Sequence, residues 1–108
     1  MNNITSFGIP DADLNALVSG LKKNIKIEEI VLFGSRAKGT FKNGSDIDIA
    51  LKGSDLELKD ILDANIEIEK LLLPYKIDLI IFNTIKEPAL VEHILRVGVV
   101  LYKKFSGF

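Results

Sequence analysis

Two aspartates separated by one residue, Asp46 and Asp48, lie in the alternating segment Ser45–Leu51. Side chains two residues apart in a β-strand project from the same face, so their Cβ atoms are expected to lie roughly 6–7 Å apart. Carboxylates that close repel each other unless a cation lies between them, and Mg²⁺ takes oxygen ligands of this kind. The pair therefore predicts a metal site, although an isolated Asp-x-Asp pattern more often marks an acidic, solvated strand face.

The pair Gly34-Ser35 directly follows the apolar run Ile30–Phe33. Glycine allows the backbone to approach a ligand closely, and N–H groups in a tight turn or at a helix start bind anions. By itself this is a turn signal, but on the strand next to the aspartates it predicts a phosphate site over the carboxylates. Arg36 is expected to contact the same phosphates because its planar guanidinium matches them, with a solvated loop position as the alternative.

A third carboxylate, Asp78, interrupts the apolar segment Ile77–Phe82. Burying an unpaired carboxylate costs several kcal/mol, so Asp78 is expected to be paired, exposed at the strand end, or metal-bound. A salt bridge to Lys76 or Arg36 is the plain structural explanation. With the other two aspartates present, completion of the metal site is the favoured one.

The elements that position these residues follow from hydrophobic periodicity. It predicts helices over residues 11–24, 55–73 and 87–97, and strands over residues 27–33, 45–51, 77–82 and 99–102. A short connection permits antiparallel pairing of the first two strands, whereas the helix between the second and third requires a parallel crossover. We therefore expect an α+β fold in a single domain spanning residues 1–108, with a small mixed β-sheet covered by helices on one face.

Composition removes several classes of function. Without cysteine there is no disulfide or thiolate metal site, and the single histidine, His93, excludes a His-rich zinc site and a Ser-His-Asp triad. His93 itself is expected to be a surface or partly packed residue. A net charge of −1 argues against a broad nucleic-acid surface. The first residues resemble no secretory signal and no apolar run could span a membrane, so the expected location is cytoplasmic.

The combination of Gly34-Ser35, ten intervening residues, Asp46-Ile47-Asp48 and the later Asp78 resembles the DNA polymerase beta-type nucleotidyltransferase superfamily. The short chain and the segments FGSRAKG and SDIDIAL are most similar to its minimal nucleotidyltransferases. Those are small prokaryotic proteins that act as antitoxins of HEPN-domain toxins. The resemblance covers roughly residues 27–102 and implies a polymerase beta palm-like fold.

This resemblance also implies an activity, which is Mg²⁺-dependent transfer of AMP from ATP to a hydroxyl, with a tyrosine of a cognate HEPN toxin as the acceptor. Gly34, Ser35 and Arg36 would bind the nucleotide. Asp46 and Asp48 would hold two Mg²⁺ ions, and Asp78 would join one of them and help to deprotonate the acceptor. Two such ions stabilise both the attacking and the leaving oxygens.

Two alternatives stay open on the sequence. The acceptor is a small molecule such as an antibiotic, or the protein is a non-catalytic antitoxin that neutralises its partner by binding. Little sequence follows Phe82 to build a further substrate domain. We therefore expect the acceptor site to come from another polypeptide, a HEPN-domain protein encoded next to this one, and expect neither a membrane nor direct nucleic-acid binding.

Overall fold

The computed structural model describes residues 7–105, which form four α-helices, four strands and one 3₁₀ turn. Every strand and long helix that periodicity predicts is found. The remaining residues of the expected single domain, 1–6 and 106–108, lie outside the described part. In chain order the elements are α1 (Asp11–Leu21), β1 (Glu29–Phe33), α2 (Gly34–Lys38), β2 (Ile47–Lys52), α3 (Leu58–Glu69), β3 (Ile77–Ile81), η1 (Phe82–Thr84), α4 (Pro88–Val97) and β4 (Val99–Lys103).

The four strands form one mixed sheet in the order β3-β2-β1-β4. Strand β1 pairs antiparallel with both β2 and β4, and β2 pairs parallel with β3. The parallel pair is joined through α3, because two parallel neighbours need a connection that returns the chain to the same end of the sheet. The mixed sheet and its α+β class are thus confirmed.

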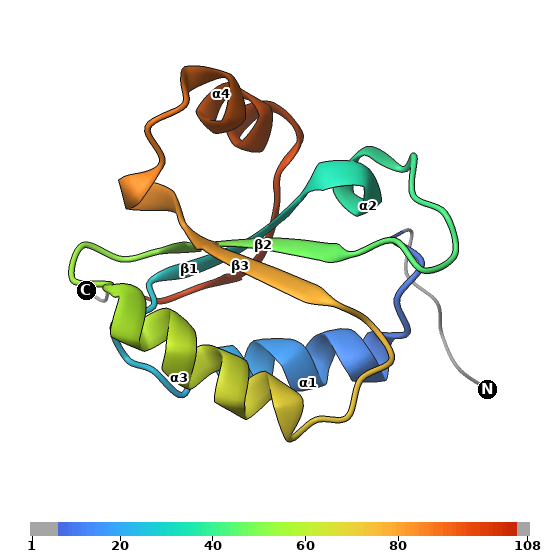
Figure 1. The fold of residues 1–108 in the computed structure, drawn as a ribbon, viewed down its shortest axis with the longest axis horizontal. Helices are drawn as coiled ribbons and strands as arrows, with labels where there is room; N and C mark the ends of the chain where they lie inside the picture. The colour runs from blue at the N-terminus through green and yellow to red at the C-terminus, as the bar shows by residue number, and fades with distance from the viewer. Residues whose placement is uncertain (1–6, 106–108) are drawn as a thin grey trace.

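One face of the sheet is buried by α1 and α3, which lie together beneath it in Figure 1. The isoleucines of β2 point to this face and are fully buried, as the alternation predicts: Ile47 and Ile49 are 1% and 0% exposed. They join a core to which α1 contributes Leu17 and Leu21. This face supplies most of the buried apolar surface, which is the main favourable contribution to folding.

The opposite face carries a second, smaller apolar cluster, and α4 covers it (Figure 1). Val31 and Phe33 of β1 and Ala50 of β2 are buried there against Ile94 of α4. The expectation that helices cover one face therefore describes α1 and α3 but leaves out α4. Its place has a physical reason, because apolar residues on the second face also need cover from water. In residues 7–105 no helix combines the length and apolarity that crossing a bilayer would require.

A buried ion pair ties the end of α1 to α3. Asp60 is 7% exposed and accepts hydrogen bonds from Asn24 Nδ2 at 2.8 Å and from the backbone N–H of Glu57 at 2.8 Å. Lys26 Nζ lies 2.7 Å from its second oxygen. The Lys26 contact first, and the Glu57 N–H next, lower the pKa of Asp60 to about 2.

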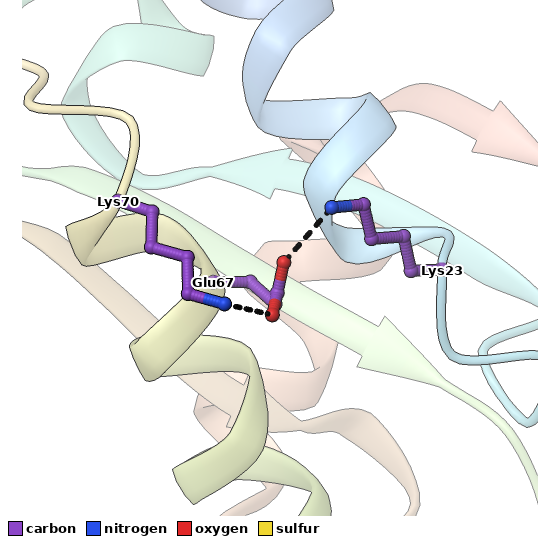
Figure 2. A network of polar contacts seen from close by, with 3 residues as sticks. All are labelled: Lys23, Glu67 and Lys70. Atoms are coloured by element: carbon purple, nitrogen blue, oxygen red, sulfur yellow. Dashed lines mark hydrogen bonds and ion pairs between the residues drawn. The ribbon is translucent and has the colours of Figure 1, made fainter.

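The outer part of the same helix pair carries an exposed network. Glu67 of α3 lies between Lys23, 3.0 Å away, and Lys70, 3.1 Å away (Figure 2). These lysines lower the pKa of Glu67, and Lys23 has the largest effect. Water and salt screen exposed pairs of this kind, so they contribute little to stability.

Replacing Asp60 by asparagine removes the charge without changing the size of the side chain. Because folding lowers the pKa of Asp60, its ionised form stabilises the folded state above about pH 4, and this contribution is lost as the pH falls from about 4 to about 2. We expect D60N to melt several degrees below the wild type at pH 7 and at nearly the same temperature at pH 2, measured by circular dichroism. E67Q, the control on the same helix, should differ less at pH 7. Equal melting of D60N and wild type at pH 7 would contradict this account.

Candidate active site

The parallel register of β2 and β3 places Asp48 directly opposite Asp78. Asp46 comes immediately before β2, two residues from Asp48. Burial raises the pKa of Asp48, and the negative charges of Asp78 and then Asp46 raise it further. The structure therefore brings the three predicted carboxylates within electrostatic range of one another, on the face opposite the isoleucine core.

The side chain of Asp78 is partly exposed and pairs with a lysine. Its side chain is 45% exposed, and Lys76 Nζ lies 3.9 Å from its Oδ1. Lys76 is itself largely exposed, so this ion pair is long and solvated and contributes little. The predicted salt bridge to Lys76 exists, but it leaves Asp78 open to a further partner.

The donor set fits a hard divalent cation. It consists of carboxylate oxygens, which Mg²⁺ prefers. Burial first, and then repulsion from Asp78 and Asp46, raise the pKa of Asp48, and a bound cation would relieve the repulsion. Within residues 7–105 no group of three His, Asp or Glu side chains is already arranged to hold a metal ion. Because Mg²⁺ is commonly held by one or two carboxylates together with substrate phosphates, Asp46, Asp48 and Asp78 are the residues that would hold it here.

The glycine-serine turn meets the carboxylates at the end of β1. The antiparallel register pairs Phe33 with Asp48, and Gly34 follows with φ +78°, a conformation that favours glycine. A Cβ atom built on Gly34 would fall on the carboxylate of Asp48. Only glycine allows this approach, so the predicted phosphate turn and the predicted metal ligand lie side by side.

Comparisons with known proteins agree with this geometry. The model of the family described as "Polymerase beta, Nucleotidyltransferase" matches residues 15–106. The chain belongs to this family. No curated protein sequence matches it.

Several solved structures are similar to this nucleotidyltransferase in sequence and in fold. A toxin-antitoxin complex crystallised with AMP-PNP is 28% identical, with a TM-score of 0.70 over 84% of this chain and 73% of that chain. A complex of tri-AMPylated HEPN toxin with MNT antitoxin from Shewanella oneidensis is 24% identical, with a TM-score of 0.65 over 86% and 71%. A Sulfolobus solfataricus protein described as a nucleotidyltransferase is 20% identical, with a TM-score of 0.51 over 100% and 96%. The last two likenesses show the fold, and together the comparisons confirm the predicted resemblance to minimal nucleotidyltransferases.

Arg36 has a different position from the one that the sequence suggested. It is 3% exposed, and its guanidinium lies 5.3 Å from the ring centroids of both Phe41 and Tyr75. All of its nitrogens donate to backbone carbonyls, which belong to Ser45, Phe7 and Gly8. In this nucleotidyltransferase Arg36 therefore fixes the loop that leads to Asp46, and each of its three nitrogens already donates to a backbone carbonyl.

His93 is the site residue whose position the sequence did not indicate. It is partly buried, as expected, but its Nε2 accepts a hydrogen bond from the backbone N–H of Gly34 at 3.2 Å. A histidine between apolar helix positions carries no pattern that would separate this role from ordinary packing.

Replacing Arg36 by lysine should destabilise the fold without removing a nucleotide contact. Ser45 O accepts from both Nε and Nη2 of Arg36, at 3.1 and 2.8 Å, and a lysine ammonium cannot reproduce this fork. We expect R36K to lower the free energy of unfolding in urea by about 1.5–3 kcal/mol, the contribution of a hydrogen bond to a charged group. The affinity of the folded variant for AMP-PNP should change little. Unchanged stability with lost affinity would instead support the phosphate contact.

The crowded carboxylates predict a conflict between stability and function. Because folding raises the pKa of Asp48, the ionised side chain destabilises the folded state, and this penalty grows as the pH rises from the usual pKa of the carboxyl to its raised pKa. We expect D48N to melt a few degrees above the wild type at pH 7 in EDTA, and Mg²⁺ to raise the melting temperature of the wild type but not that of D48N. D63N, which removes an exposed carboxylate on α3, serves as the control. Melting of D48N below the wild type in EDTA would refute this.

Proposed function

We propose that this protein is a Mg²⁺-dependent adenylyltransferase that transfers AMP from ATP to a tyrosine of a HEPN-domain toxin, and so acts as its antitoxin in the cytoplasm. The observation that carries the proposal is the approach of the Gly34 turn to the Asp48 carboxylate, with Asp78 opposite. This places an anion-binding turn beside a cation-binding cluster, as a nucleoside triphosphate with its metal requires. The 28% identity to a toxin-antitoxin complex crystallised with AMP-PNP supports the same reading.

Each part of the site has a separate task in this proposal. The turn at Gly34 and Ser35 orients the phosphates, and the Ser35 hydroxyl is a further group that can donate to them. Asp46, Asp48 and Asp78 would hold two Mg²⁺ ions, which supply charge neutralisation at the phosphates when bound. Holding the reactants in line accounts for much of the rate enhancement in reactions of this type.

The reaction itself is a displacement at the α-phosphate. The acceptor oxygen forms a bond to the α-phosphorus, the bond to the β-phosphate oxygen breaks, and pyrophosphate leaves. Asp78 receives the proton of the acceptor hydroxyl, because its half-exposed side chain is the carboxylate that an incoming macromolecule can reach. The tri-AMPylated toxin in the Shewanella complex has the product chemistry that this step would give.

The test uses ATP labelled at either the α- or the γ-phosphate, together with Mg²⁺, this protein and the HEPN protein encoded next to it. We expect label from the α-phosphate, and none from the γ-phosphate, on a tyrosine of the toxin. The double variant D46A/D48A should lose the transfer by about 100-fold or more, as expected for loss of electrostatic stabilisation of the transition state. A tyrosine-to-phenylalanine variant of the toxin provides the acceptor control.

Two outcomes would replace the proposal. If no label is transferred and D46A/D48A still neutralises the toxin, the protein is a binding antitoxin without chemistry. If label passes to an added antibiotic and not to the toxin, the acceptor is a small molecule. Both alternatives keep the fold, so the assay decides between functions and not between structures.

A further inference from the structure

The imidazole of His93 connects α4 to the turn after β1. Nε2 accepts the hydrogen bond from Gly34 N–H at 3.2 Å, so in this arrangement the ring carries its proton on Nδ1. The ring also stands edge-on to Phe33, with centroids 6.1 Å apart and planes at 79°, a favourable aromatic geometry. His93 therefore contacts both residues at the junction of β1 and α2.

Helix α4 packs tightly against β1, and this packing fixes the position of His93. Ile94, next to His93, is 2% exposed in the cluster with Val31. Gly98 ends the helix where any larger residue would collide, since a Cβ there would lie 2.7 Å from Val31 Cγ1. The position of the imidazole is thus set by packing on β1, and not by a mobile surface helix.

Gly34 is the first residue of α2, where a backbone N–H has no partner within the helix. Gly34 has no side chain, its φ is +78°, and it loses more conformational freedom on folding than any other residue type would. The same residue faces the Asp48 carboxylate, but its N–H donates to His93 and not to that carboxylate. A fixed acceptor for its N–H therefore limits which conformations the turn can adopt.

We propose that His93 is a positioning residue of the nucleotide site, which holds the Gly34 turn in the conformation that presents Ser35 to the phosphates. The role rests on the proposed function. It also changes the part assigned to Gly34: its N–H is engaged by His93, so the glycine supplies close approach to Asp48 while Ser35 supplies the donors. Helix α4, which lies over this face, thereby becomes part of the site.

The experiment compares H93F, H93Q and the control E92Q. Phenylalanine keeps the ring contact with Phe33 but has no acceptor, whereas the glutamine oxygen can reach the place of Nε2. Glu92 is the exposed neighbour on the same helix and pairs only with Arg96 in the described structure. Hydrogen exchange of the Gly34 amide, AMP-PNP affinity with Mg²⁺, and KM and kcat for ATP are measured on each.

We expect H93F to exchange the Gly34 amide faster, and to raise the Kd for AMP-PNP and the KM for ATP by about 3- to 10-fold, the effect of one lost neutral hydrogen bond. The change in kcat should be smaller. H93Q should recover most of the affinity and the slow exchange, and E92Q should match the wild type. This pattern of rescue is not expected of a residue that only packs.

Two results would overturn the proposal. Unchanged exchange and affinity in H93F would make His93 an ordinary packed residue, and tighter binding would mean that nucleotide displaces the imidazole. If H93F does not fold, H93Q becomes the test. The proposal is then rejected if H93Q exchanges the Gly34 amide faster, or binds AMP-PNP more weakly, by as much as the loss of one hydrogen bond would cause. Absence of AMP transfer by the wild type would contradict the proposed function alone, since exchange and AMP-PNP binding need no acceptor.

Discussion

The site depends on a close approach between a backbone turn and a carboxylate. Asp48 lies against Gly34 with no room for a Cβ between them, and this approach requires two strand registers at once. The antiparallel register sets Phe33 opposite Asp48, and the parallel register sets Asp78 opposite it on the other side. A slip of one residue in β2 would turn both aspartates into the isoleucine core. The buried isoleucines therefore specify the active site as well as the fold.

The two faces of the sheet have opposite energetic roles. Ile47 and Ile49 are buried beneath α1 and α3 and stabilise the fold. On the other face, burial and like charges disfavour the ionised form of Asp48. Such conflict between stability and chemistry is common at functional sites, where a strained arrangement is retained for what it does. The small size of the protein makes the first face important, because a short chain has little stability to spare.

Much of the site could be predicted because its pattern is local. Asp46 and Asp48 share a face through the period of a strand, and Asp78 stands out in an apolar segment. The positions of Arg36 and His93 could not be predicted, since both make their contacts with residues distant in the chain. A guanidinium beside a glycine turn has the same sequence pattern whether it binds phosphate or, as here, the carbonyls of Gly8 and Ser45. The position of His93 follows from the packing of α4, and periodicity does not say on which face of a sheet a helix lies.

The commitment of Arg36 to carbonyl oxygens has a consequence for how the proposed site would receive its substrate. The cation nearest to the turn in sequence does not point at the phosphates, so the turn offers them neutral donors. Three carboxylates and a triphosphate repel each other strongly at short range. In the proposed reaction, nucleotide and divalent cations must therefore enter as coupled partners, each favouring the binding of the other. The turn and the carboxylates are then two halves of one binding site, and the shape of the turn matters because neutral hydrogen bonds depend on geometry more than ionic attraction does.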